Sequence, residues 1–296
     1  MYSVIISSYE HNSVARPVYE ISKGNVSYSV AKVYDDNRLT LKSFEELITS
    51  ETKAIVCMVG SNVTGQIMPF REIAALCRKH DICFIADGAQ GCGVIPVKMS
   101  DGINILCTSG HKSLYGISGT GLLITDGKYR MPHIIEGGTG STSLELEQPD
   151  FLPDSLESGT INTVGAISLG AGIDFITESG LDKIFNHETM LCNIFINEIS
   201  AVNDVIIYRK PRVKYLPIVS FNIEGITANQ TAESLSDKGF ALRGGLHCSG
   251  FAHREIGTLP DGTVRFSPSL FNTANDVRQL AYAIRETIKE KNNNKF

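Results

Sequence analysis

The first half of the chain alternates short apolar runs with segments whose apolar residues recur at helical spacing. Short apolar runs are typical of buried strands, and the helical spacing indicates amphipathic helices. The predicted strands lie at residues 4–7, 27–33, 54–59, 82–86, 103–108 and 121–125, and the predicted helices at 13–22, 43–48 and 70–80. This alternation predicts an α/β fold with a mainly parallel sheet and helices on both faces.

The second half follows a different pattern. An irregular stretch rich in Thr, Ser, Gly and Pro spans about residues 137–159, and long irregular segments in compact domains are often functional. Helical patterns then cover 166–178 and 181–199, and beyond them come predicted strands at 205–208, 218–223 and 264–267 and predicted helices at 227–238 and 274–288. We therefore predict a large domain over residues 1–180 and a small α+β domain over residues 181–296.

Composition narrows the class of protein. The chain has 296 residues, 42% of them hydrophobic, and a net charge of −5, so it can bury a substantial core. No basic field would attract nucleic acid or an anionic membrane. The sequence has no long uninterrupted apolar run, and the N-terminus has neither a basic region nor a signal-peptide cleavage site. We expect a cytoplasmic protein that binds neither nucleic acid nor membrane.

Seven cysteines form an odd set without paired spacing, so neither a disulfide framework nor a metal site is predicted. Most of them lie in apolar strands or helices and are expected to be reduced core residues. Cys248 alone lies in a polar, glycine-rich segment. Its position distinguishes it as a candidate for chemistry.

Two polar motifs follow neighbouring predicted strands. Asp87-Gly88-Ala89-Gln90 comes directly after the strand at 82–86, and Ser109-Gly110-His111-Lys112 after the strand at 103–108. Ligands of open α/β sheets bind at the carboxyl ends of the strands. A lysine can hold the aldehyde of pyridoxal phosphate as a Schiff base, while a buried carboxylate keeps the pyridine nitrogen protonated. Either motif alone could be a surface turn, but together they indicate pyridoxal phosphate chemistry.

These motifs belong to a longer ordered set. Gly119-Thr120-Gly121 follows them, and the whole resembles the cofactor site of the class V aminotransferase group, which has the fold type I of pyridoxal phosphate enzymes. Arg243-Gly244-Gly245-Leu246-His247-Cys248, Val264-Arg265-Phe266-Ser267 and Phe271-Asn272-Thr273 resemble the cysteine desulfurases within that group. The likeness runs from Tyr9-Glu10-His11-Asn12-Ser13 to about Thr273.

The resemblance implies a role for each matching cofactor residue. Lys112 would be the Schiff-base lysine, Asp87 the partner of the pyridine nitrogen, His11 the imidazole on the ring face, and Gln90 a contact of the phenolic oxygen. The other implied cofactor contacts are Asn62, Ser109, His111 and, from a partner subunit, Thr160. An active homodimer is therefore implied as well.

The resemblance also implies a substrate site. Arg265 would bind the carboxylate of the amino acid, Asn62 and Arg243 would lie beside it, and Cys248 would accept the sulfur. Cationic neighbours raise the thiolate fraction of a cysteine, so Arg243 and His247 are expected to assist Cys248.

Each residue taken singly has an ordinary structural alternative. His11 could cap the helix that begins near Ser13, and Asn62 could serve a turn. Arg265 could make a structural salt bridge, and Cys248 could be a small buried hydrophobe. The ordered set of motifs outweighs these alternatives jointly.

The implied function is a cysteine desulfurase that converts L-cysteine to L-alanine and leaves the sulfur as a persulfide on Cys248. The sulfur acceptor is unknown. The alternatives are a selenocysteine lyase acting on L-selenocysteine, another class V enzyme such as an aminotransferase, or an inactive truncated homologue.

The chain departs from the family pattern at its start. Family members usually have several dozen residues before the segment that matches Tyr2, and part of that segment binds the cofactor phosphate at a helix N-terminus. We expect the phosphate site here to depend on Ser109, His111 and a partner's Thr160. The chain is then a fragment, is complemented by a separately encoded segment, or has lost activity.

Overall fold

The computed structural model describes residues 2–293, which contain a six-stranded and a three-stranded sheet. The order of strands in the larger sheet is β2 (Val26–Ala31), β1 (Tyr2–Ser7), β3 (Thr52–Met58), β4 (Cys83–Asp87), β5 (Ile105–Ser109) and β6 (Gly121–Thr125). Neighbouring strands from β2 to β5 pair in parallel, and β6 runs antiparallel to β5. The prediction of a mainly parallel α/β sheet is confirmed.

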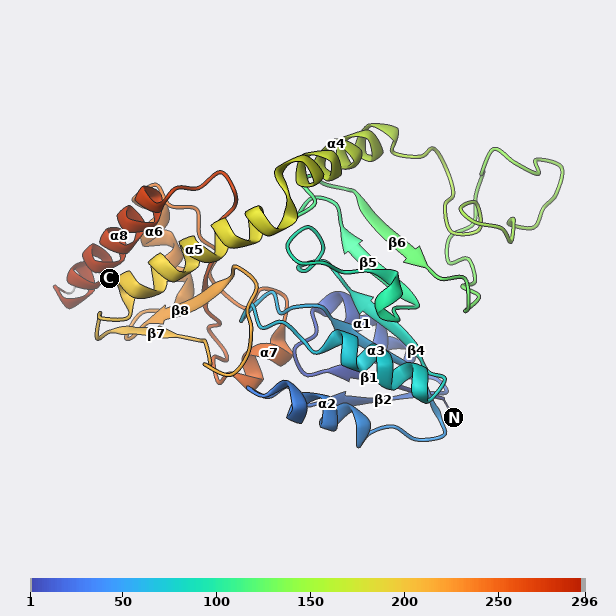
Figure 1. Cartoon of the computed structure of the whole chain (residues 1–296), viewed down its shortest axis with the longest axis horizontal. Helices are drawn as coiled ribbons and strands as arrows, with labels where there is room; N and C mark the ends of the chain where they lie inside the picture. Colours follow the sequence, from blue (N-terminus) through green and yellow to red (C-terminus); the bar gives the residue numbers. More distant parts are fainter. Residues whose placement is uncertain (1, 294–296) are drawn as a thin grey trace.

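Helices cover both faces of this sheet (Figure 1). Successive side chains of a strand point to opposite faces, so Ile5 and Ile6 belong to different cores. Val18 of α1 (Asn12–Ile21) packs on the Ile6 face. The Ile5 face is covered by α2 (Asn37–Glu45) and α3 (Phe70–Lys79), whose buried aromatic residues are Phe44 and Phe70.

One predicted helix was misplaced. The apolar spacing predicted a helix at residues 43–48, whereas α2 begins at Asn37 and ends at Glu45. The Asp36 carboxylate accepts a hydrogen bond from the Arg38 backbone N–H at 2.8 Å and so caps the helix. The capping residue therefore determines where this helix begins.

The second part of the chain begins with two long helices, α4 (Thr163–Ser179) and α5 (Leu181–Ile199), joined by Gly180 with φ 86°. Its three-stranded antiparallel sheet and remaining long helices are β7 (Val205–Ile207), β8 (Val219–Ile223), β9 (Val264–Phe266), α6 (Ala228–Asp237) and α8 (Ala274–Asn292). The rings of Phe195 and Phe266 stack in its core with centroids 4.4 Å apart. A domain boundary near residue 180 stays a prediction.

Residues 126–162, between β6 and α4, form no helix or strand and extend away from the sheet (Figure 1). Two short elements that the sequence pattern did not predict are the 3₁₀ helix η1 (Met99–Asp101) and the helix α7 (Gly250–Glu255). Within residues 2–293, no helix combines the length and apolar character needed to cross a membrane.

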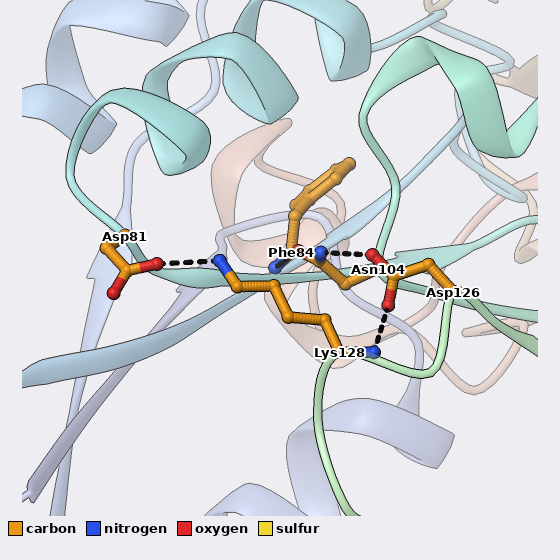
Figure 2. Close-up of polar contacts among 5 residues, drawn as sticks. All are labelled: Asp81, Phe84, Asn104, Asp126 and Lys128. Atoms are coloured by element: carbon orange, nitrogen blue, oxygen red, sulfur yellow. Dashed lines mark hydrogen bonds and ion pairs between the residues drawn. The ribbon is translucent and has the colours of Figure 1, made fainter.

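A polar network joins β4, β5 and β6 at the edge of the sheet where β4 and β5 begin (Figure 2). The Asn104 side chain accepts a hydrogen bond from Phe84 N–H at 2.9 Å and donates one to Asp126 at 2.7 Å. Lys128, which follows β6, pairs with Asp81 before β4 at 2.6 Å. The antiparallel edge strand is therefore connected to its parallel neighbours by side chains as well as by backbone pairing.

We predict that Asn104→Ala lowers the free energy of unfolding by about 1–3 kcal/mol, because it leaves the Phe84 N–H and the Asp126 carboxylate without this partner. Lys128→Ala should cost much less than Asn104→Ala, because its ion pair with Asp81 is exposed and screened by solvent. Urea unfolding of both variants and the wild type measures the difference. Equal losses would contradict the role given to Asn104.

Candidate active site

Four neighbouring parallel strands end at one cavity of about 1070 Å³. Asp87, at the end of β4, and the segments that follow β1, β3 and β5, with His11, Asn62 and Lys112, form part of its wall. This arrangement follows from the topology, because the carboxyl ends of parallel strands lie at the same edge of a sheet. The predicted association of the two polar motifs is therefore observed.

The cavity gathers most of the residues that the sequence indicated. The predicted site residues on its wall are His11, Asn62, Asp87, Gln90, Ser109, His111, Lys112, Arg243 and Arg265. Thr160 is exposed and does not line it. Cys248 is also exposed and absent from the wall, although the preceding residue, His247, lines it.

Lys112 is half-buried on the cavity wall and has no hydrogen-bonding or ionic partner among residues 2–293. Burial lowers the pKa of its ammonium; Asp87 opposes this shift, while Arg265 and Arg243 add to it. The environment therefore increases the neutral fraction of the amine. A neutral amine can act as a nucleophile or as a base.

Asp87 is the last residue of β4, and several backbone contacts fix its position. Its Oδ1 accepts a hydrogen bond from Ala89 N–H at 2.9 Å, and its carbonyl accepts one from Val59 N–H at 2.8 Å. The next residue, Gly88, donates to Cys107 O at 2.7 Å. These contacts hold the carboxylate between β3 and β5, on the same cavity as Lys112.

His11 both caps a helix and lines the cavity. Its Nδ1 accepts a hydrogen bond from Ser13 N–H at 3.1 Å, so it caps α1 as the structural alternative foresaw. Its ring also lines the cavity. Burial, followed by the charge of Lys112, lowers the pKa of the imidazole. A cap and a cavity-facing ring are therefore compatible in the same residue.

Arg265 carries its charge into the cavity without a carboxylate partner among residues 2–293, so the structural alternative of a salt bridge is not observed. Its Nη1 donates to the backbone carbonyl of Asn62 at 2.9 Å. Burial and then the neighbouring Arg243 lower the pKa of its guanidinium. The strand pairing brings the two arginines together, since Arg265 N–H donates to Arg243 O at 2.9 Å.

The charged groups of the cavity favour an anionic ligand. Lys112, Arg243 and Arg265 line it together with the two carboxylates of Asp87 and Glu157. Two arginines side by side match a carboxylate or phosphate group. The cavity can therefore bind an anion beside an amine of lowered pKa.

His247 was expected to be a cationic neighbour of Cys248, and this prediction is wrong. Its side chain is only 3% exposed, and burial followed by the charge of Arg265 lowers its pKa to about 3. The ring is neutral near pH 7 and its Nδ1 has no hydrogen-bond partner. It therefore supplies no positive charge to Cys248, and Arg243 remains the candidate cation.

Glu10, for which the sequence pattern indicated no role, is completely buried beside the site. Its Oε1 accepts hydrogen bonds from the Ser7 hydroxyl and from Met58 N–H, the latter at 3.0 Å, and its Oε2 has no partner. Met58 pairs with Asp87 in the sheet. Glu10 thus joins the ends of β1 and β3; an acid before His11 was visible in the sequence, but its burial was not.

The irregular segment before α4 also contributes to the cavity, through Leu152, Pro153, Leu156 and Glu157. Its proline and glycine content predicted irregular structure, and its length suggested a function. Nothing in its pattern indicated which of its residues would line the cavity. The contact depends on the path of the loop in three dimensions.

Comparison with known proteins agrees with this geometry. The family model for class-V aminotransferases matches residues 2–280. A probable cysteine desulfurase from Halalkalibacterium halodurans is 30% identical over 290 residues, an alignment that covers 96% of this chain and 70% of the relative.

Solved structures of similar proteins have the same fold. The apo structure of the cysteine desulfurase from Thermococcus onnurineus NA1 superimposes with a TM-score of 0.87 and 28% identity, covering 97% of this chain and 73% of that one. A cysteine desulfurase from Escherichia coli has a TM-score of 0.89 at 23% identity, which is a likeness of fold, and covers 97% of this chain and 72% of that one.

Burial of Glu10 predicts a pH-dependent stability. Burial raises its pKa from about 4.5 to about 8, so the folded protein keeps a proton that the unfolded chain releases between these values. Folding stability therefore falls as the pH rises through this range. Glu10→Gln removes the titration, and its stability relative to wild type should grow by roughly 1–4 kcal/mol between about pH 5 and pH 8.

Urea unfolding at several pH values measures this difference. The matched control is Glu233→Gln, which changes an exposed glutamate of α6 and should show no such trend. A stability difference for Glu10→Gln that does not change with pH would contradict a protonated buried Glu10.

Proposed function

Because this chain belongs to the class-V aminotransferase family, we propose that it is a pyridoxal-phosphate-dependent cysteine desulfurase. Such an enzyme converts L-cysteine to L-alanine and transfers the sulfur to a cysteine of its own as a persulfide. The observation that carries the proposal is a cavity lined by Lys112, Asp87 and Arg265, with the Cys248 segment at its edge. The cysteine desulfurases among the relatives and solved structures support it.

The residues of the cavity fit pyridoxal phosphate in charge and in kind. Lys112 would bond to the cofactor aldehyde, Asp87 would pair with the pyridine nitrogen, and His11 would lie against the ring. The remaining proposed cofactor contacts are Asn62, Gln90, Ser109, His111 and, from a second subunit, Thr160. When bound, pyridoxal phosphate supplies an electron sink for negative charge at the α-carbon of an amino acid.

Lys112 is suited to proton transfer. Its pKa is lowered by burial and by the two arginines, so Nζ is neutral more often than an exposed lysine amine. A neutral Nζ can accept the α-proton of bound cysteine and later return a proton to the product. We propose Lys112 as the general base of the reaction.

The two arginines are suited to orient the substrate. Arg265 would bind the α-carboxylate of cysteine, and Arg243 and Asn62 would lie beside it. The Arg265 guanidinium is already held by a hydrogen bond of 2.9 Å to Asn62 O, which limits its movement. A guanidinium held in place binds a carboxylate with less loss of side-chain entropy.

Cys248 would carry out the sulfur transfer. Its thiolate would attack the sulfur of bound cysteine, forming a sulfur–sulfur bond while the substrate Cβ–S bond breaks. The electron pair of the broken bond stays with the carbon skeleton, which takes up protons to become alanine. Cys248 is the exposed cysteine of the seven, so the persulfide could be reached by an acceptor protein.

We further propose that the enzyme is a cytoplasmic homodimer. Apolar side chains are exposed on the edge strand β6 and on the adjacent start of α4, including Leu123 at 50% and Val164 at 72%. Exposed contiguous apolar residues are typical of a surface that binds protein. A second subunit there would also bring another copy of the 126–162 segment, with its Thr160, near the site.

Cys248→Ala tests the sulfur acceptor. With pyridoxal phosphate and L-cysteine, peptide mass spectrometry should detect a persulfide at Cys248 of the wild type and none in the variant. Cofactor binding should be unchanged, because Cys248 does not line the cavity. The control Cys83→Ala removes a buried thiol from the start of β4 and should keep the persulfide. Full sulfur transfer by Cys248→Ala would contradict the proposed role.

Leu123→Glu tests the dimer. The substitution introduces a charge into the exposed apolar surface of β6, so sedimentation velocity should show dimer for the wild type and mainly monomer for the variant. Leu39→Glu, on the exposed side of α2, should leave the sedimentation coefficient unchanged. A wild-type protein that sediments as a monomer would contradict the proposal.

A further inference from the structure

The backbone around Cys248 adopts an uncommon conformation. His247 and Cys248 have φ angles of 49° and 57°, which lie in the left-handed region. Side chains with a Cβ rarely adopt this region, and two consecutive residues do so only when their surroundings hold them there. The contacts of this segment therefore decide where the Cys248 thiol lies.

One side chain, Asn62, contacts the segment on both sides of Cys248. Its Nδ2 donates to the carbonyl of His247 at 2.8 Å, and its Oδ1 accepts a hydrogen bond from the Ser249 hydroxyl at 2.8 Å. Asn62 is 4% exposed and Ser249 is fully buried. The amide cannot be reversed, because its oxygen would then face the carbonyl oxygen of His247.

A third contact fixes the residue between them. The Asn12 backbone N–H, at the start of α1, donates to the carbonyl of Cys248 at 2.8 Å. Ser249 N–H in turn donates to Leu246 O at 2.9 Å. The segment is thus held by the loop after β3 and by the first residue of α1, the same two regions that bring Asn62 and His11 to the cavity.

We propose that Asn62 and Ser249 act as positioning residues, forming a side-chain bridge that holds the Cys248 thiol at the edge of the cavity. The inference rests on the function proposed for Cys248. An amide nitrogen carries two hydrogens, so the bridge leaves one Asn62 donor for a ligand in the cavity. Asn62 also links Cys248 to the substrate site, because its backbone carbonyl accepts the hydrogen bond from Arg265.

Hydrogen–deuterium exchange of the full chain without added cofactor tests the bridge. Ser249→Ala should speed exchange about fivefold both in the peptide covering residues 246–252 and at the Asn12 amide, since one side-chain hydrogen bond is lost. Ser234→Ala is the matched control, because it removes another buried hydroxyl, which is hydrogen-bonded to Thr287 at 3.0 Å and does not contact the Cys248 segment. It should leave both reporters unchanged.

Two further variants separate positioning from general destabilisation. Ser249→Thr keeps the hydroxyl and should restore wild-type exchange. In a double-mutant cycle, Asn62→Ala and Ser249→Ala should not act independently: Ser249→Ala should add less than about twofold to Asn62→Ala, because the Ser249 hydroxyl has then already lost its acceptor.

Unchanged exchange in Ser249→Ala, equal acceleration by Ser234→Ala, or independent effects in the cycle would each overturn the proposal. Exchange requires neither cofactor nor cysteine turnover. A failed bridge is therefore distinguishable from a failed desulfurase assignment.

Discussion

Parallel pairing of β1, β3, β4 and β5 is the constraint on which the rest of the structure depends. Their carboxyl ends lie at one edge of the sheet, so four segments far apart in the sequence deliver side chains to the same cavity. The opposite edge carries the network around Asn104, which connects β6 to the parallel strands. The side of the sheet where β4 and β5 begin thus contributes to stability. The side where the parallel strands end is free to carry polar groups whose pairing is incomplete.

Burial of charged groups gives this edge its chemical character. It lowers the pKa of Lys112 and of Arg265, and it raises that of Glu10. The cations of the cavity have no carboxylate that pairs with them by hydrogen bonds within residues 2–293. Such an arrangement costs folding free energy unless a ligand compensates it. Unpaired charge in a cavity is therefore itself an indication of binding.

The sequence was sufficient to predict the fold and most of the residues on the cavity wall. Strands such as β4 and β5 are short apolar runs, and Asp87 and Lys112 follow them directly, so topology alone predicts that they meet. The neutral state of His247, the buried acid Glu10 and the Asn62–Ser249 bridge were not predictable in this way. Each depends on contacts between segments distant in the sequence: Ser249 and Asn62 are 187 residues apart. The start of α2 was misjudged for a local reason, since the cap at Asp36 outweighed the apolar spacing.

The central claim is that this cavity binds pyridoxal phosphate through Lys112, and a visible absorption spectrum tests it most directly. Purified protein with added cofactor should develop the absorption band of a lysine-bound cofactor, distinct from that of free pyridoxal phosphate. Lys112→Ala should lack the band, while Lys98→Ala, which changes an exposed lysine outside the cavity, should keep it. A wild-type spectrum identical to that of free cofactor, or an undiminished band in Lys112→Ala, would contradict the account.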